Sequence, residues 1–156
     1  MLRSIFKFFT TFFVPLALYR FISEYISVLP GTWYDNLNKP GISPPGYFFE
    51  SILIILFILM GLSFFHIWIK PRIIERTIAK IIYVAQLILV FTWLLIFFHF
   101  HNILLSLIVV AFLLVAVVLM IIKFYRLKPL AAYLNFPYLL WVIYIAIFNI
   151  SIFVIN

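Results

Sequence analysis

The sequence contains no cysteine and few charged residues, and each shortage excludes a class of protein. Without cysteine the chain has no disulfides and no thiolate metal sites. Charged residues make up 10% of the 156 residues and hydrophobic residues 68%, whereas soluble domains are about a quarter charged. A water-soluble domain of this length has too much surface for its volume to bury so much apolar area. We therefore expect lipid to be the solvent for most of the chain.

Acidic residues are especially scarce, which limits both the partners and the chemistry. The four Asp and Glu against eleven Lys and Arg give a net charge of +7. The basic residues fall in short turns between apolar runs, so we interpret them as membrane-flanking and predict no nucleic-acid partner. His99 and His101 could bind a metal or a haem iron, but no third ligand is close in sequence, and an interfacial turn explains them better. The sequence predicts no catalytic residue, no metal site and no required cofactor.

Five runs are continuously apolar and long enough to cross a hydrocarbon core of about 30 Å as helices. The runs cover approximately residues 4–29, 47–69, 78–98, 103–122 and 131–155. Because they do not alternate at every second residue, helices are favoured over barrel strands. The predicted fold class is an all-α membrane protein, in which residues 1–156 form a single domain. It is a bundle of five transmembrane helices with a long first extramembrane loop at residues 30–46.

Most basic residues lie at one end of this predicted bundle, which sets its orientation. Nine of the eleven lie at the start of the first run, between or beside runs two and three, or between runs four and five: Arg3, Lys7, Lys70, Arg72, Arg76, Lys80, Lys123, Arg126 and Lys128. By the positive-inside rule the N-terminus is cytoplasmic, and the first loop and the C-terminus lie outside. The first run resembles a secretory signal, but it is too long and lacks a cleavage site, so we expect it to be retained. We expect a multi-pass protein of a bacterial cytoplasmic membrane, with the lipid bilayer as a partner.

Two of the predicted helices carry stripes that mix polar groups with large rings at steps of three and four residues. In the last run the stripe consists of Tyr138, Trp141, Ile145 and Asn149. In the third run it consists of Gln86, Val90, Trp93 and Phe97. Ordinary packing between helices would explain both stripes. A flat apolar pocket with a few polar groups to orient a ligand would also explain them, and the stretch 32–47 would then close over it as a lid.

Three motifs in the chain match a known family. The loop motif W-Y-x-x-L-x-K-P-x-x-x-P-P consists here of Trp33, Tyr34, Leu37, Lys39, Pro40, Pro44 and Pro45. The motif P-Y-x-x-W…N near the C-terminus consists of Pro137, Tyr138, Trp141 and Asn149. A third motif on the third run consists of Gln86, Trp93, Phe97 and Phe98. With these motifs the chain resembles the TspO family of translocator proteins, also called tryptophan-rich sensory proteins or peripheral-type benzodiazepine receptors.

The resemblance implies a five-helix bundle, often a homodimer, that binds a ligand between its helices under the first loop. Family ligands are porphyrins, haem-type tetrapyrroles and synthetic isoquinoline or benzodiazepine drugs, and animal members also bind cholesterol. The implied function is that of a receptor or regulator of tetrapyrrole handling or stress response. The resemblance and the stripes together give these ligand-binding residues: Trp33, Tyr34, Pro44, Pro45, Leu53, Val90, Trp93, Phe97, Tyr138, Trp141, Ile145 and Asn149.

Four positions depart from the family pattern. The family usually has Trp where this chain has Leu53, Asn at Val90, Asp at Val109 and Ala at Ile145. These changes remove polar groups that would orient a ligand and add bulk to the implied pocket.

Two alternative functions stay open. The first is a transporter of tetrapyrroles or lipid-like solutes, for which Arg20 and Glu24, four residues apart on the first run, are the only candidates for buried charges. The second is a light-dependent porphyrin-degrading enzyme, as reported for some family members. Leu53 disfavours the second alternative, because the activity is attributed to pocket tryptophans.

Overall fold

The computed structural model describes residues 2–24, 33–43, 46–71 and 73–156, which form helices and the turns between them. The helices are α1 (Leu2–Ser23), α2 (Trp33–Asn36), α3 (Gly46–Trp68), α4 (Ile74–Phe98), α5 (Ile103–Leu127), α6 (Pro129–Tyr133) and α7 (Phe136–Ile155). The helices α1, α3, α4 and α5 and the pair α6–α7 are each long and apolar enough to cross a membrane. The prediction of an all-α membrane protein with five transmembrane helices is confirmed.

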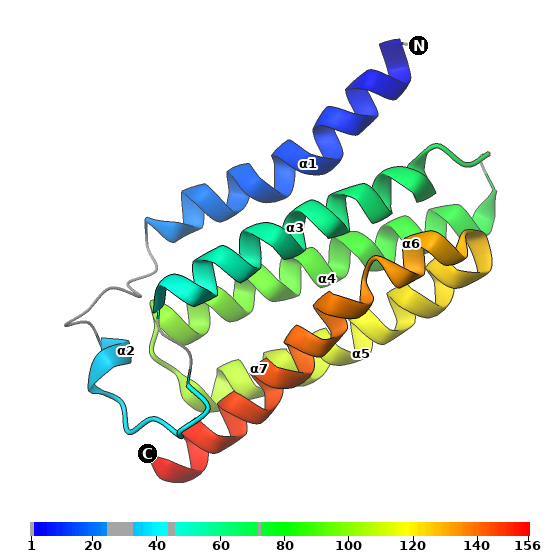
Figure 1. Cartoon of the computed structure of the whole chain (residues 1–156). Helices are drawn as coiled ribbons and strands as arrows, with labels where there is room; N and C mark the ends of the chain where they lie inside the picture. Colours follow the sequence, from blue (N-terminus) through cyan, green and yellow to red (C-terminus); the bar gives the residue numbers. More distant parts are fainter. Residues whose placement is uncertain (1, 25–32, 44–45, 72) are drawn as a thin grey trace.

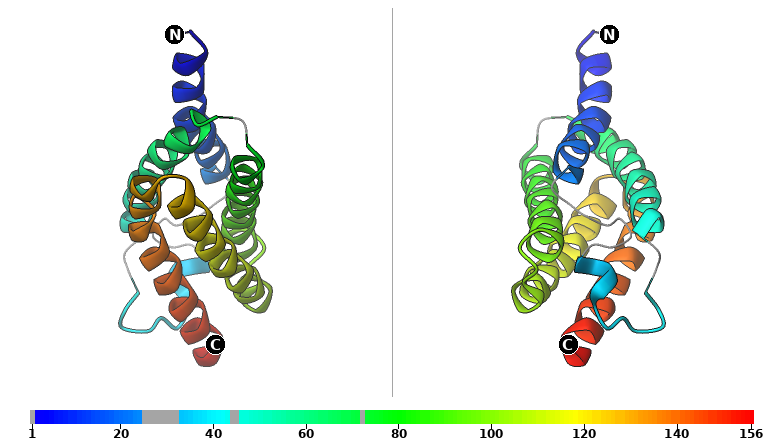
Figure 2. Two further views of the ribbon diagram at one scale, coloured as in Figure 1. Left: turned by 90° about the vertical axis from the view of Figure 1, so that its right-hand side faces the viewer. Right: turned by 90° about the vertical axis from the view of Figure 1, so that its left-hand side faces the viewer.

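The long helices run up and down the bundle, so that successive connections alternate between its two ends (Figure 1). One end, here called the basic end, holds the first turns of α1, the α3–α4 turn and the α5–α6 junction. The other, here called the loop end, holds α2, the α4–α5 turn and the last turn of α7. The packing is closest between α4 and α5, between α5 and α7, and between α1 and α3. The first turns of α1 extend beyond the other helices (Figure 2).

Several helices end at other residues than the apolar runs do. The helix α4 begins at Ile74 rather than at residue 78, and α5 continues to Leu127 rather than to residue 122. Both extensions carry basic residues. Their backbone can remain helical at the membrane interface, because the long basic side chains reach the polar layer. Hydropathy locates the hydrocarbon-spanning part of a helix and not its ends. The helix α1 ends at Ser23, and residues 25–29 of the first predicted run lie outside the described residues.

The last predicted run is two helices rather than one. The helix α6 ends at Tyr133, and α7 begins at Phe136 with Pro137 in its first turn, where the missing proline N–H costs no helical hydrogen bond. The fully buried Asn135 at the break donates from Nδ2 to the carbonyl oxygen of Ala131 at 2.8 Å and to Ser63 Oγ at 2.5 Å. Ser63 Oγ in turn donates to the same carbonyl at 2.6 Å. The Ala131 carbonyl at the break is thus partnered inside the bundle.

Candidate functional site

Aromatic rings close the loop end of the bundle. Tyr34 of α2 is only 1% exposed, and its ring contacts Phe49 of α3, Phe98 of α4 and Phe148 of α7 at centroid distances of 6.0, 5.8 and 6.3 Å. Edge-on and tilted contacts of this kind add to the stabilisation from burial. The predicted lid residue Tyr34 therefore fills the space under the first loop with its own side chain.

The neighbours of Tyr34 keep its hydroxyl neutral. Lys39 Nζ lies 4.5 Å from the centroid of the Tyr34 ring and 3.0 Å from Asp35 Oδ1. Burial raises the pKa of the Tyr34 phenol well above its usual value, and the charges of Tyr144 and Asp35 raise this pKa further. The short helix α2 is therefore bound to the bundle end by an uncharged ring beneath it, and the ion pair at its surface lies within the loop.

Trp33, the other aromatic residue of the loop motif, lies at the rim of the loop end. Its half-buried ring stacks on His101 with 4.4 Å between centroids and 19° between planes, and meets the edge of Phe97 at 5.5 Å. His101 adopts a positive φ of 56° in the α4–α5 turn. The predicted lid residues Pro44 and Pro45 lie outside the described residues.

Six further predicted site residues are buried against one another or against neighbouring helices: Val90, Trp93, Phe97, Tyr138, Ile145 and Asn149. Asn149 Oδ1 accepts from Ser106 Oγ at 2.8 Å and from Trp93 Nε1 at 3.5 Å, and Asn149 Nδ2 donates to the Ile145 carbonyl at 2.9 Å. Tyr138 donates from its hydroxyl to Gln86 Oε1 at 2.8 Å. The polar groups of the two stripes thus hold α4, α5 and α7 together.

Leu53, at the position where the family usually has tryptophan, faces a very small space. It is 2% exposed and borders a void of about 10 Å³ together with Tyr19, Phe49, Leu94 and Phe98. Such a void holds roughly one water molecule. The structure therefore leaves no room for a ligand beside Leu53.

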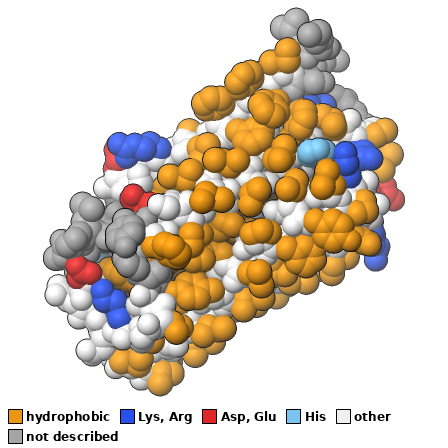
Figure 3. All heavy atoms as spheres, in the orientation of Figure 1, with side chains coloured by type: hydrophobic (Ala, Val, Ile, Leu, Met, Phe, Trp, Pro, Cys, Tyr) orange, Lys and Arg blue, Asp and Glu red, His pale blue; other side chains and the backbone are white. Residues whose placement is uncertain are grey.

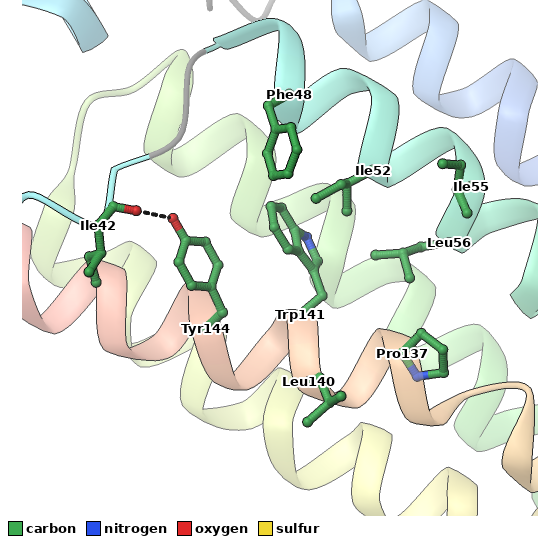
Figure 4. A pocket seen from close by; sticks show the side chains of 9 residues that line it. All are labelled: Ile42, Phe48, Ile52, Ile55, Leu56, Pro137, Leu140, Trp141 and Tyr144. Carbon is green, nitrogen blue, oxygen red and sulfur yellow. Dashed lines mark hydrogen bonds between the residues drawn. The ribbon is translucent and has the colours of Figure 1, made fainter.

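An open groove of about 530 Å³ lies between α3 and α7, beneath the turn at residues 40–43 (Figure 4). Its lining residues are Ile42, Phe48, Ile52, Ile55, Leu56, Pro137, Leu140, Trp141 and Tyr144. Among the predicted site residues that the structure describes, Trp141 is the one that lines the groove. Tyr144 was not among the predicted site residues. Its spacing of three residues from Trp141 could have indicated it, because that spacing puts both on the same helix face.

The rings of Trp141 and Tyr144 form a flat aromatic wall in this groove. They stack with 5.1 Å between centroids and 25° between planes. The Tyr144 hydroxyl donates to the Ile42 carbonyl at 2.8 Å and so holds the 40–43 turn over the groove (Figure 4). The buried Trp141 Nε1 has no hydrogen-bond acceptor among the described residues. The groove therefore offers a flat apolar molecule an apolar wall that includes these two rings, and an unpartnered N–H donor lies buried within that wall.

The groove lacks groups for acid–base or metal chemistry in the part of the chain that the structure describes. Its lining side chains are apolar apart from the Tyr144 hydroxyl and the Trp141 N–H. No group of three or more His, Asp or Glu side chains that could hold a metal ion occurs among the described residues. The described lining can bind and orient an apolar ligand.

Comparison with known proteins gives one consistent match. The TspO/MBR family profile matches residues 11–155. The chain is 30% identical over 125 residues to the tryptophan-rich protein TspO of Archaeoglobus fulgidus, and this alignment covers 80% of each chain. It is 31% identical over 132 residues to the protein of the same name from Chlorobaculum tepidum, and this alignment covers 81% of this chain and 82% of the relative. It is 30% identical over 128 residues to protein CrtK of Rhodobacter capsulatus, and this alignment covers 81% of this chain and 80% of the relative.

The family match and the helices agree. The matched residues 11–155 include most of α1 and all of α3, α4, α5 and α7. The chain is a multi-pass integral membrane protein, and it belongs to the TspO/MBR family.

Proposed function

We propose that the protein binds a porphyrin, a haem-type tetrapyrrole or a similar flat apolar molecule in the groove between α3 and α7, and that it acts as a receptor or regulator. Tetrapyrrole handling or a stress response would be the regulated process. A relative from Cereibacter sphaeroides, 32% identical over 112 residues, is named a tryptophan-rich sensory protein, which supports the regulatory role. The groove volume of about 530 Å³ falls in the usual range of ligand sites, about 300–1,000 Å³.

The unused N–H of Trp141 is the observation that carries the proposal. A buried donor without an acceptor destabilises a protein by about 1–3 kcal/mol, and hydrocarbon chains offer it no partner. A ligand in the groove that places a nitrogen or oxygen acceptor in the plane of the indole ring, beside its N–H, would remove this penalty. Porphyrins combine a wide flat ring with such atoms.

The groove opens toward the bilayer, which favours a ligand that dissolves in lipid. Ile55 and Leu140, which line the groove in the spanning parts of α3 and α7, are 57% and 67% exposed. In a membrane these side chains face acyl chains rather than water. Figure 3 shows continuous hydrophobic surface on this face, with charged side chains toward its two ends. A ligand would therefore enter sideways from the bilayer.

Binding without catalysis or transport is the form of the proposal that we favour. Arg20 and Glu24, the charges that a transport pathway would use, form an ion pair at 3.7 Å with side chains 75% and 63% exposed. This supports a surface pair rather than a buried pathway. We propose further that the basic end lies in the cytoplasm of a bacterial cell and that the membrane is the inner one, as the positive-inside rule favours.

The test is a titration of the purified full-length protein with protoporphyrin IX, read from the shift of the porphyrin Soret band. Saturable binding is expected, and Trp141→Phe should weaken it about fivefold, because the ring stays while one neutral hydrogen bond of about 1 kcal/mol is lost. Ile55→Trp should block the groove and weaken binding further.

Trp68→Phe is the matched control, because it changes a tryptophan at the basic end, away from the groove. It should leave the affinity unchanged. Binding that does not saturate, or an affinity that neither Trp141→Phe nor Ile55→Trp alters, would refute the groove as the porphyrin site.

A further inference from the structure

Basic residues outnumber acidic residues at the basic end. Both ion pairs found among the described residues, Arg20–Glu24 and Lys39–Asp35, lie at the loop end. Glu75 is the one acid that the sequence places at the basic end. The described basic side chains there are Lys7, Lys70, Arg76, Lys80, Lys123, Arg126 and Lys128. An anionic partner from outside the chain would be attracted to this end.

Two of these lysines meet at one tryptophan. Trp68 is the last residue of α3, and its half-buried ring lies 5.9 Å from Lys7 Nζ of α1 and 5.1 Å from Lys80 Nζ of α4. Lys7 Nζ also donates to the Trp68 carbonyl oxygen at 3.2 Å. Three helices thus bring two ammonium groups to one indole ring.

A third cation lies one helical turn from Lys80. Arg76, 8% exposed, donates from Nη1 to the Lys70 carbonyl at 2.6 Å, just beyond the end of α3. Its buried Nε finds no acceptor among the described residues. Capping of α3 explains part of this arrangement, but the C-terminus of a helix carries only about half a negative charge. Three cationic side chains therefore converge at an end where the sequence places a single acid, Glu75, and an anionic group would be attracted to them.

An apolar groove begins beside Lys80 on the outer face of α4. It has a volume of about 310 Å³ and is lined by Thr77, Lys80, Ile81 and Val84. Ile81 is 63% exposed and Val84 48%, so that an apolar strip continues from the charged cluster toward the middle of the span. An anionic head and an apolar tail, joined end to end, would match this surface.

We propose that Lys7, Trp68, Arg76 and Lys80 bind the phosphate headgroup of an anionic phospholipid, and that one acyl chain of this lipid lies over Ile81 and Val84. The site lies on α1, α3 and α4 at the basic end, whereas the tetrapyrrole groove lies between α3 and α7 toward the loop end. It is therefore independent of the proposed function. Each basic residue near a membrane surface strengthens the attraction of anionic lipid about fivefold.

The test compares two brominated lipids as quenchers of tryptophan fluorescence in the full-length protein. The protein is reconstituted in phosphatidylcholine vesicles that contain a minor fraction of brominated phosphatidylglycerol or, in parallel, of brominated phosphatidylcholine. Phosphatidylglycerol should quench more strongly at equal mole fraction. Trp68→Phe should abolish this excess, because Trp68 is the tryptophan at the site.

A pair of double variants separates a built site from general surface charge. Lys7→Gln/Lys80→Gln should lower the relative affinity for phosphatidylglycerol about fivefold for each lysine removed, and Lys7→Arg/Lys80→Arg should retain most of it. Lys123→Gln/Lys128→Gln removes the same charge from the same end but away from Trp68, and it should change little. Equal losses in both glutamine variants, no lipid preference in the wild type, or an excess that survives Trp68→Phe would overturn the proposal.

Discussion

The side chain of Asn156 forms two hydrogen bonds with the backbone of Asn38. Its Nδ2 donates to the Asn38 carbonyl at 3.0 Å, and its Oδ1 accepts from the Asn38 N–H at 3.1 Å. With the bond from Tyr144 to Ile42, α7 holds the first loop on both sides of Pro40. The described part of the loop is thus a cover attached to α7, which agrees with ligand entry from the bilayer rather than through the loop.

Removal of the Asn156 amide should loosen this cover. Asn156→Ala should raise the rate of amide hydrogen exchange in peptides from residues 33–43, because it removes two exposed hydrogen bonds. Together these bonds stabilise the loop by about 1 kcal/mol. Ser151→Ala is the control, since the Ser151 hydroxyl donates within α7, to the Ile147 carbonyl at 2.9 Å, and forms no other hydrogen bond among the described residues. If exchange in the 33–43 peptides stays at the wild-type rate in Asn156→Ala, the two bonds do not hold the loop.

The contact between α1 and α3 should be sensitive to a single methyl group. A Cβ atom on Gly61 would lie 2.7 Å from the Thr11 carbonyl oxygen, which is backbone and cannot move aside alone. Gly61→Ala should therefore destabilise the protein by about 1–3 kcal/mol, measured as a lower thermal unfolding midpoint in detergent. Gly41→Ala is the matched control, because a Cβ there meets nothing within 4 Å. Similar midpoints for both variants would show that the helices can separate at no cost.

The number and order of the helices could be predicted from the sequence, because a chain in lipid must satisfy its backbone within helices and hydropathy marks where it does so. The division of the last run could not be predicted in this way. Pro137 is compatible with the interior of a kinked span and equally with the first turn of a new helix. The bonds from Asn135 to Ser63 and Ala131 decide for a new helix, and they join residues far apart in the sequence.

The stripes in the sequence located buried faces but could not tell a packed face from the wall of a groove. Trp93 and Trp141 lie on such stripes in the same manner. In the structure the Trp93 N–H reaches Asn149, whereas the Trp141 N–H has no acceptor among the described residues and borders the groove. The difference depends on which helix lies opposite each ring, and spacing within one helix carries no such information.

The ionisation of Tyr34 should release α2 at high pH. Burial raises its pKa well above that of an exposed tyrosine, which is about 10. A raised pKa in the folded state means that its stabilising contribution is complete below about pH 10 and is lost as the pH rises through the folded value. Tyr34→Phe should lower the stability at neutral pH slightly and should lessen the loss of stability above about pH 10.

The unfolding midpoint of wild type and Tyr34→Phe, measured across this pH range, checks the prediction. The other tyrosines are common to both proteins, so the difference between the two curves isolates Tyr34. Parallel curves above about pH 10 would mean that the phenol ionises without disturbing α2.

The buried amide of Asn149 should matter more than any other polar group shared by α4, α5 and α7. Asn149→Leu leaves Trp93 Nε1 without its acceptor and removes the acceptor of Ser106 Oγ, which keeps a bond to the Ile103 carbonyl at 2.7 Å. A buried donor without an acceptor destabilises a protein by about 1–3 kcal/mol, so Asn149→Leu should lower the free energy of unfolding by at least that much. Trp93→Phe/Asn149→Leu should restore part of the loss, because the unpartnered N–H is gone. If the double variant is as unstable as the sum of both single variants, the 3.5 Å contact between Trp93 and Asn149 carries no energy.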